Sequence, residues 1–180
     1  LAEVIKYAVI KDEKLFNFLK NNFKKIISKD LLALQRIVKD CSRIKAKITS
    51  SDEKETRGYR TILNFGHTIG HAIEAASGYS GYNHGQAVSL GMVVAIDLSS
   101  RLKLIDHKLA TRIENLIKLY GLPVKLKIIS INKIIQAHYH DKKFSGKENK
   151  FVLISGIGKT KIVRCVSLEL IKESIKKLSG

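Results

Sequence analysis

Residues 60–74 read RTILNFGHTIGHAIE, a stretch that combines helical spacing with a stripe of polar side chains. On an α-helix, positions 60, 64, 67 and 71 fall within an arc of roughly 60°, and position 74 lies close to the same line. The stripe consists of Arg60, Asn64, His67, His71 and Glu74, and the residues between are mostly apolar: Ile62, Leu63, Phe65, Ile69, Ala72 and Ile73. We therefore predict a largely buried helix over residues 60–76. Because buried polar groups need partners, the stripe must face a ligand, a metal or a polar network that fixes packing.

The rest of the chain also has mainly helical spacing. Apolar residues recur every three or four positions over residues 3–10, 12–27, 31–49, 85–101, 106–120, 131–140 and 168–178, with Asp30 as an N-cap. Residues 77–85, SGYSGYNHG, read as a loop. Strand character appears only near the end, where FVLIS and TKIVRCV flank a Gly-Ile-Gly turn. The predicted fold is mainly α: one multi-helix domain over residues 1–180 with a small C-terminal β-hairpin.

Composition fits a globular protein. The chain has 180 residues, 44% of them apolar, enough for one domain with its own core. No apolar run is long enough to span a bilayer and no signal peptide precedes the first helix, so we expect a cytoplasmic protein with no membrane partner. The chain opens on Leu1 in place of Met, which predicts a piece of a longer protein. Cys41 and Cys165 lack metal-ligand spacing and are expected to be two buried, reduced thiols.

The formal net charge of +17 fits nucleic acid, an acidic membrane surface or a small anionic substrate. Much of this charge comes from lysines scattered along helices, as on a solvated face: Lys20, Lys24, Lys25 and Lys29. A non-catalytic basic module that binds nucleic acid is the alternative of a different class. Such a module needs exposed basic faces, whereas the polar stripe here lies on an apolar helix. Nucleic acid is therefore not the expected partner, and a salt titration of nucleic-acid binding tests this.

Several residues have the chemistry of metal ligands. His67 and His71 are four positions apart, so both can face one ion from the same side of a helix. His84, in NHGQAV, stands where a helix begins, and the positive end of the helix dipole disfavours its protonation there. Glu3 lies one helical turn from Lys6. A carboxylate with two neutral imidazoles and one open position is a common catalytic zinc set, and spacing alone leaves the choice of histidines open.

Four blocks of the sequence resemble, in order and spacing, the signature blocks of the 3-dehydroquinate synthase family. They are LAEVIKYAVI, KDCSRIKAKITSSDEKETRGYRTILNFGHTIGHAIE, HGQAVSLGM and HDKKFSGKENKFVLISGIGK, and together they cover nearly the whole chain. The resemblance implies a zinc ion held by Glu3, His67 and His84. Cobalt is the alternative, because such sites select partly by the availability of the metal. The resemblance also makes His71 a contact of the substrate's phosphate. It therefore does not imply a metal chelated by His67 and His71 on one helix.

The resemblance also implies roles for residues that face the substrate, a phosphorylated seven-carbon keto acid. Lys6 and Glu55 match residues facing its hydroxyl-bearing ring. Lys45 and Arg60 match cations near its carboxylate, and Asn64 matches a second phosphate partner beside His71. A lysine of HDKK also reaches the substrate anion, with Lys142 expected and Lys143 the alternative. Donors of this kind suit such an anion. Glu74 receives no substrate role, and a partner for a histidine is the role that its chemistry suits.

The implied reaction converts 3-deoxy-D-arabino-heptulosonate 7-phosphate into 3-dehydroquinate and phosphate, a step of the shikimate pathway, with NAD used transiently. The family's N-terminal NAD-binding domain is not in this sequence, so we expect the chain alone to be inactive, and the full-length protein to be a homodimer. SGIGKT is not a phosphate-binding loop, because Leu153 stands where its first Gly belongs. The alternative enzyme is another sugar-phosphate cyclase, such as 2-deoxy-scyllo-inosose synthase. Its substrate has no carboxylate, so Lys45 and Arg60 favour 3-dehydroquinate synthase.

Overall fold

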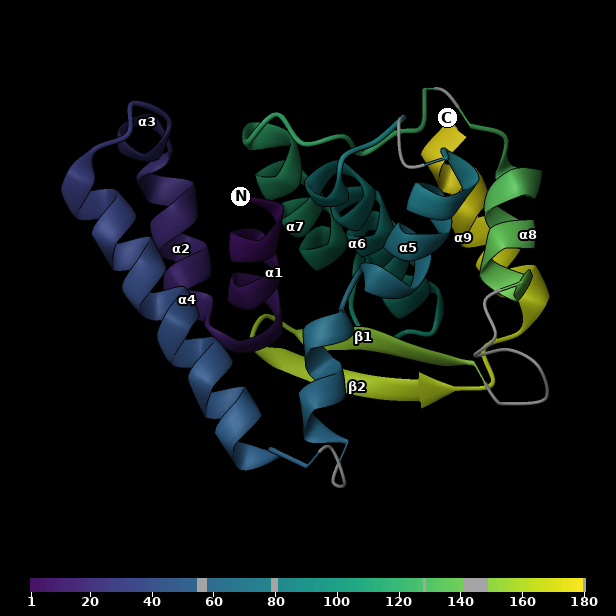
Figure 1. Ribbon diagram of the computed structural model, residues 1–180, viewed down its shortest axis with the longest axis horizontal. Coiled ribbons are helices and arrows are strands. Elements are labelled where there is room, and N and C mark those ends of the chain that lie inside the picture. The colour runs from purple at the N-terminus through teal and green to yellow at the C-terminus, as the bar shows by residue number, and fades with distance from the viewer. Residues whose placement is uncertain (55–57, 79–80, 128, 141–148, 180) are drawn as a thin grey trace.

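The computed structural model describes residues 1–54, 58–78, 81–127, 129–140 and 149–179, with the backbone alone for Tyr139 and His140. The elements follow in this order: α1 (Ala2–Lys11), α2 (Glu13–Asn21), α3 (Phe23–Ile27), α4 (Leu31–Ser51), the 3-10 helix η1 (Tyr59–Asn64), α5 (His67–Ala76), α6 (His84–Arg101), α7 (His107–Leu119), α8 (Ile131–His140), β1 (Lys150–Gly156), β2 (Lys159–Arg164), α9 (Leu168–Lys176) and the 3-10 helix η3 (Lys177–Ser179). The predicted fold class, mainly α with a C-terminal hairpin, is confirmed (Figure 1).

Helix α6 forms the centre of the core. Residues 87–99 are all buried, as expected of a helix that is apolar on every side. Helices α1, α5, α7 and α9 and strand β1 pack around it. Asp97, the acidic residue in this stretch, pairs with Arg101 at 2.6 Å and with Lys177 at 3.5 Å. These pairs offset the cost of burying its charge and tie α6 to the C-terminal end of the chain.

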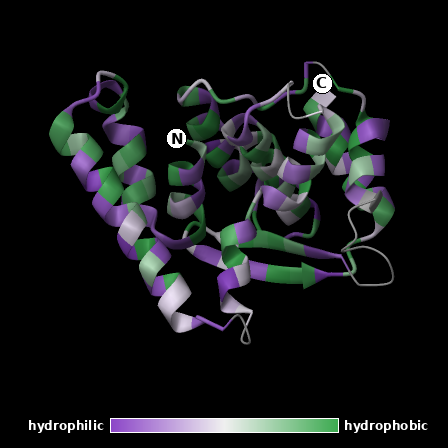
Figure 2. Cartoon of the chain, viewed as in Figure 1, coloured by the Kyte–Doolittle hydropathy of each residue, from purple (hydrophilic) through white to green (hydrophobic). Residues whose placement is uncertain are grey.

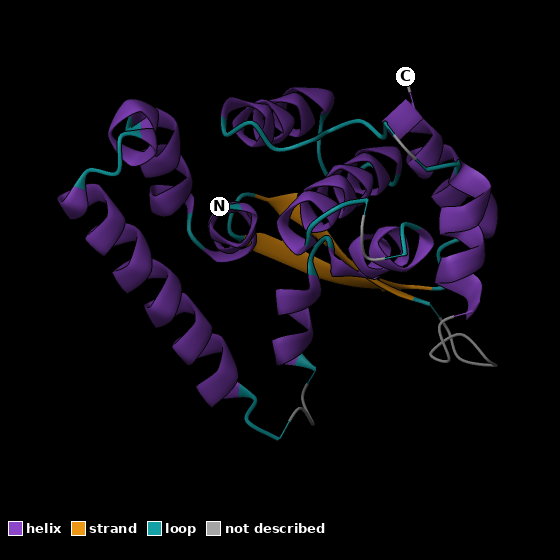
Figure 3. Cartoon of the chain, turned by 45° about the horizontal axis from the view of Figure 1, so that its top comes forward, coloured by secondary structure: helices purple, strands orange, loops and turns teal. Residues whose placement is uncertain are grey.

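The β-hairpin closes one side of the helical core (Figure 3). Strand β1 pairs antiparallel with β2 from Lys150 opposite Arg164 to Gly156 opposite Lys159. The Ser99 hydroxyl on α6 accepts a hydrogen bond from the backbone N–H of Ile154 at 3.1 Å, which joins the core helix to the hairpin. Gly158 in the turn has φ +78°. SGIGKT is thus a hairpin turn, as predicted.

Helices α2, α3 and α4 stand at one side of the molecule, with α4 as a long rod (Figure 1). The Asp30 carboxylate caps α4 by accepting from the backbone N–H of Ala33 at 2.9 Å, as the sequence predicted. One face of α4 buries Ala33, Ile37, Ile44 and Ile48. Hydrophilic and hydrophobic bands alternate along its length (Figure 2). Helix α4 therefore packs through one stripe, mainly against α1 and η1.

Two of the predicted helices are interrupted. The segment 12–27 forms α2 and α3, separated at Asn22. The segment 60–76 is not one helix, because η1 ends at Asn64 and Gly66 adopts φ +78° before α5 begins. A Cβ at Gly66 would lie 2.6 Å from Met92 Cγ and 2.9 Å from the backbone oxygen of Val88. The helix is interrupted here because the backbone at Gly66 lies directly against α6. The helical spacing of apolar residues in the sequence continues through this interruption.

The prediction of two buried thiols was wrong. Cys41 on α4 is half-buried and Cys165 is exposed, and the two are not joined by a disulfide. Cys165 follows β2 with φ 54°, and its N–H donates to the backbone oxygen of Asn149 at 3.0 Å. It therefore lies at the open end of the hairpin and not in the core. Among the described residues, no helix combines the length and apolar character needed to cross a membrane.

Candidate metal centre

Helix α1 supplies a carboxylate and an ammonium group to one site. Lys6 is only 3% exposed, and its Nζ lies 2.7 Å from Glu3 Oε2, one turn earlier on the helix. Burial lowers the pKa of Lys6, the Glu3 carboxylate raises it, and Lys45 lowers it further, with a net decrease. Burial raises the pKa of Glu3, but the hydrogen bond and charge of Lys6, with the nearby histidines, outweigh burial and lower it. Glu3 is therefore a carboxylate at neutral pH.

His67 is the first residue of α5 and presents one ring nitrogen to Glu3. Its Nδ1 hydrogen-bonds the backbone oxygen of Phe65 at 3.2 Å, and its Nε2 lies 3.4 Å from Glu3 Oε1. A carbonyl oxygen can only accept, so Nδ1 carries the proton and the Nε2 lone pair faces Glu3. Burial, followed by the charge of Lys6, lowers the pKa of His67. The ring is therefore neutral at pH 7, as a metal ligand must be.

The close approach of α5 and α6 fixes the position of His67. A Cβ at Gly91 on α6 would lie 1.9 Å from the backbone oxygen of Gly66 and 2.8 Å from the backbone nitrogen of Gly70. Only a residue without a side chain fits there. Because Gly66 directly precedes His67, this contact sets the start of α5 against α6.

His84 is the first residue of α6. A capping box fixes this helix start: Asn83 Oδ1 accepts from the Gln86 N–H, and Gln86 Oε1 accepts from the Asn83 N–H, both at 3.0 Å. The His84 Nε2 lies 3.7 Å from Glu3 Oε1, while its Nδ1 lies 3.0 Å from Glu74 Oε1. An ionised carboxylate can only accept, so here too Nδ1 donates, and Nε2 is the ring nitrogen that faces Glu3.

Three ligand atoms thus converge, one each from Glu3, His67 and His84, all within 4.8 Å of one another. Ligands bound tetrahedrally to zinc at about 2.0 Å are separated by about 3.3 Å, and the two separations from Glu3 are 3.4 and 3.7 Å. Glu3 Oε1 is buried, and the described residues offer it no hydrogen-bond donor. A buried carboxylate oxygen without a donor costs free energy that a cation would offset. The residues present therefore fit a divalent metal.

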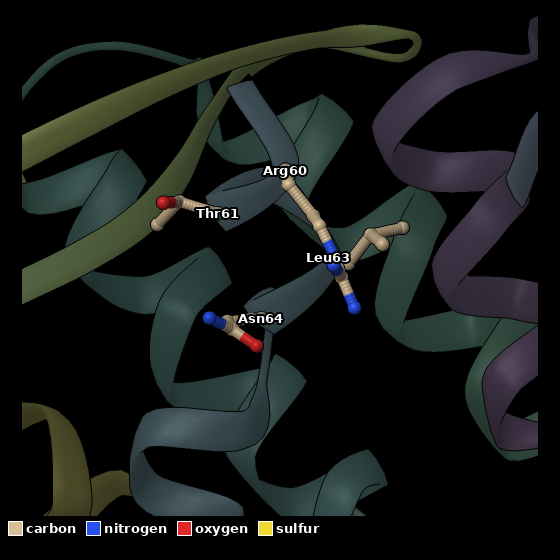
Figure 4. Close-up of a pocket in the computed structure, with 4 residues that line it drawn as sticks. All are labelled: Arg60, Thr61, Leu63 and Asn64. Atoms are coloured by element: carbon tan, nitrogen blue, oxygen red, sulfur yellow. The ribbon is translucent and has the colours of Figure 1, made fainter. Parts of the chain in front are cut away.

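The polar residues of the expected stripe do not all meet at this cluster. His71 is exposed, with its ring centroid 5.4 Å from that of His67, and it is not one of the three grouped ligands. Arg60 and Asn64 belong to η1, where they line a cavity of about 260 Å³ with Thr61 and Leu63 (Figure 4). Thr61 and Leu63 lie off the polar stripe, so no sequence pattern marked them as site residues. The regular spacing of the stripe did mark Glu74.

The structure describes some of the remaining predicted site residues and not others. Lys45 is exposed on α4, and its charge acts on Lys6. The Arg60 backbone N–H donates to Asp52 Oδ2 at 3.1 Å, which holds the start of η1 near the end of α4. Glu55, Lys142 and Lys143 lie outside the described residues. The structure thus brings together the three expected metal ligands with Lys6, and places Arg60 and Asn64 together on η1.

Fold and site define a helical domain that gathers a carboxylate and two imidazoles and has a polar cavity at η1. The family described as 3-dehydroquinate synthase C-terminal matches residues 1–144, and the chain belongs to this family. The 3-dehydroquinate synthase of Thermoanaerobacter sp. is 45% identical over 172 residues, which are 96% of this chain and 48% of that protein. That of Thermodesulfovibrio yellowstonii is 44% identical over 179 residues, 99% of this chain and 48% of that protein. The chain spans about half the length of these curated relatives.

Solved structures share the fold. A 2-epi-5-epi-valiolone synthase from Streptomyces hygroscopicus, with NAD+ and Zn2+ bound, superposes with a TM-score of 0.87 at 22% identity. The match covers 98% of this chain and 49% of that protein. A 2-deoxy-scyllo-inosose synthase complexed with carbaglucose-6-phosphate, NAD+ and Co2+ superposes with a TM-score of 0.77 at 23% identity, again over 98% of this chain and 49% of that one. At these identities the likeness establishes the fold.

Proposed function

We propose that this chain is the metal- and substrate-binding domain of a 3-dehydroquinate synthase, a cytoplasmic enzyme of aromatic amino acid biosynthesis. The full-length enzyme converts 3-deoxy-D-arabino-heptulosonate 7-phosphate into 3-dehydroquinate and phosphate, and an N-terminal domain outside this chain binds most of the NAD. The observation that carries the proposal is the convergence of Glu3, His67 and His84 in a member of this family. Without the NAD-binding domain, the chain is inactive. As a full-length protein it is a homodimer.

In this proposal the three converging residues hold a zinc or cobalt ion. When bound, the metal supplies Lewis acidity at a substrate hydroxyl, and NAD supplies a transient hydride acceptor. The Nε2 atoms of His67 and His84 and the Glu3 carboxylate leave an open coordination position for that hydroxyl. Lys6, fixed 2.7 Å from Glu3, donates a hydrogen bond to the hydroxyl-bearing ring of the substrate, which Glu55 also faces. The paired charges keep this ammonium group in place despite its burial.

The substrate's two anionic ends bind at separate groups of residues. Lys45 and Arg60 bind the carboxylate, for which a guanidinium group offers two parallel donors. Asn64 and His71 bind the phosphate, and Lys142 closes over the anion. The cavity at η1 supports the binding of an anionic substrate there, because Arg60 and Asn64 offer a cation and an amide at one polar opening (Figure 4). The high positive charge of the chain would also attract such an anion.

The test requires a full-length protein. We would join this chain to the amino-terminal half of the Thermoanaerobacter relative, confirm folding by circular dichroism, and assay phosphate release with NAD and zinc. We expect turnover of 3-deoxy-D-arabino-heptulosonate 7-phosphate and none of glucose 6-phosphate, and a His84→Ala version should be inactive. Turnover of glucose 6-phosphate alone would assign the chain to another sugar-phosphate cyclase. A folded protein that turns over neither substrate, beside an active Thermoanaerobacter enzyme, would refute the proposal.

A further inference from the structure

Glu74 is the member of the polar stripe that neither the metal nor the substrate uses. It lies on α5 two turns after His67, and its side chain is 14% exposed. Its Oε1 accepts a hydrogen bond from His84 Nδ1 at 3.0 Å. The contact joins the end of α5 to the first residue of α6, across the loop that connects them. A half-buried carboxylate at this point must have a favourable interaction that accounts for its burial.

We infer that Glu74 is a positioning residue that orients the His84 ring and keeps its proton on Nδ1, so that Nε2 is directed at the metal. The inference rests on the proposed metal centre. The geometry supports it because the two ring nitrogens face opposite partners: Nδ1 faces Glu74 at 3.0 Å and Nε2 faces Glu3 at 3.7 Å. A carboxylate behind a metal-binding imidazole fixes the tautomer and makes the ring a stronger donor.

The two histidines differ in how much they need such a partner. The side chain of His67 is 14% exposed, and a backbone oxygen holds its ring. The side chain of His84 is 51% exposed, so packing does little to restrict its rotation. A ligand held by packing is already preorganised, whereas an exposed one loses rotational freedom when it binds. Glu74 therefore restricts the rotation of the His84 ring, as packing and a backbone oxygen do for the His67 ring.

Glu74 is placed neither to bind the metal itself nor to stabilise its own helix. It is not one of the residues grouped as ligands, and its bonded oxygen lies on the Nδ1 side of His84, away from Glu3. An acidic side chain in the last turn of α5 opposes the dipole of that helix. Its charge is favourable only with respect to α6, whose N-terminus begins at His84. The position of Glu74 is thus explained by α6 and its first residue.

The first test measures zinc affinity of the chain by competition with a chromophoric chelator. We expect Glu74→Ala to weaken zinc binding by about 10- to 100-fold, the usual effect of removing a partner of a metal-binding histidine. Glu74→Gln keeps an oxygen that can accept from Nδ1, so it should weaken binding less than Glu74→Ala. The matched control is Glu114→Ala, which removes a carboxylate of similar exposure (15%) that accepts from Lys177 at 2.6 Å. The control should leave zinc affinity unchanged.

The second test needs no metal. In the metal-free chain at a pH where the ring is neutral, nitrogen NMR of labelled histidine reports which ring nitrogen carries the proton. We expect the Nδ1–H form at His84 in the parent and in Glu114→Ala, and a shift toward Nε2–H in Glu74→Ala. A merely structural carboxylate would change stability without moving this tautomer.

The outcomes separate this inference from the proposed function. If the parent chain binds zinc and Glu74→Ala binds it equally well, or if the tautomer of His84 stays unchanged, the positioning role is refuted and the metal centre stands. If the parent fails to bind zinc while Glu74→Ala alters the tautomer, the contact between Glu74 and His84 is real but the proposed metal centre is wrong. The role of Glu74 in metal binding is then refuted as well. Weaker zinc binding together with the tautomer shift supports both.

Discussion

The proposed metal side and the proposed substrate-anion side of this site are built in different ways. Glu3 and His67 come from α1 and α5, which both pack against α6, the helix that carries His84, and the three ligand atoms already converge. Lys45, Arg60 and Asn64 are exposed, on one face of α4 and on a short 3-10 helix. A metal needs ligand atoms placed to within a few tenths of an ångström, whereas long cationic side chains can reorganise around an anion. We therefore expect metal binding to depend on this chain's core, and substrate binding to depend on the whole protein.

The largest effect should come from the helix crossing that supports the metal side. Gly91→Ala places a Cβ 1.9 Å from the backbone oxygen of Gly66, so α5 and α6 must separate. We expect a loss of unfolding free energy of at least about 3 kcal/mol, measured by urea denaturation. The control is Gly85→Ala on the same helix, where the added Cβ meets no atom closer than 3.6 Å. Equal stability of the two variants would show that the crossing is not tight.

The next effect is the stabilisation that zinc gives to the folded chain. At a free zinc concentration about 100 times its Kd, the parent should gain about 2.7 kcal/mol against urea, because only the folded state holds the three ligands together. His67→Ala should lose this gain. Asn64→Ala, on the anion side, should keep it. If both variants lost the gain equally, the two sides would not be separable.

Changes on the anion side should have little effect on folding. Lys45→Gln removes an exposed charge whose electrostatic influence on Lys6 is repulsive. We expect its unfolding free energy to stay within about 0.5 kcal/mol of the parent, as is usual for surface substitutions. In the full-length enzyme the same variant should raise the KM for substrate. A large loss of stability would mean that Lys45 supports the fold.

The smallest effect concerns the packing of α4, measured by thiol reactivity. Burial first, with nearby carboxylates, raises the pKa of Cys41 to about 11. At pH 8 about 0.1% of such a thiol is thiolate, so alkylation should be slow. Cys165 is exposed and serves as the internal comparison. Mass spectrometry after brief iodoacetamide treatment should find Cys165 modified first, and the reverse order would show that α4 is loosely packed.

Most of the fold follows from the sequence because it depends on local patterns. The spacing of apolar residues predicts most helices, and the Asp30 cap and the hairpin turn also have local signatures. The interruption at Gly66 could not be predicted in this way. It is imposed by the backbone of α6, at Val88 and Met92, and the apolar spacing of residues 60–76 passes through it unchanged.

The role of Glu74 shows where reasoning from one helix ends. The regular stripe marks Glu74 as a residue that needs a partner, but that partner, His84, lies beyond a loop whose path the sequence does not specify. Likewise, the spacing of His67 and His71 permits a chelate on one helix, whereas the structure places His84 and Glu3 around His67 instead. Contacts between elements bring the proposed ligands together, and in the sequence these contacts are visible only through resemblance to a family.

The metal content of this chain tests the proposed metal centre most directly. After incubation with zinc and removal of the excess, the parent and its Glu3→Ala and His84→Ala variants would be measured by elemental mass spectrometry. A three-ligand site predicts about one zinc ion per parent chain, and loss of that zinc in both variants. A parent chain without zinc, or variants that retain it fully, would contradict the claim that Glu3, His67 and His84 form a metal site.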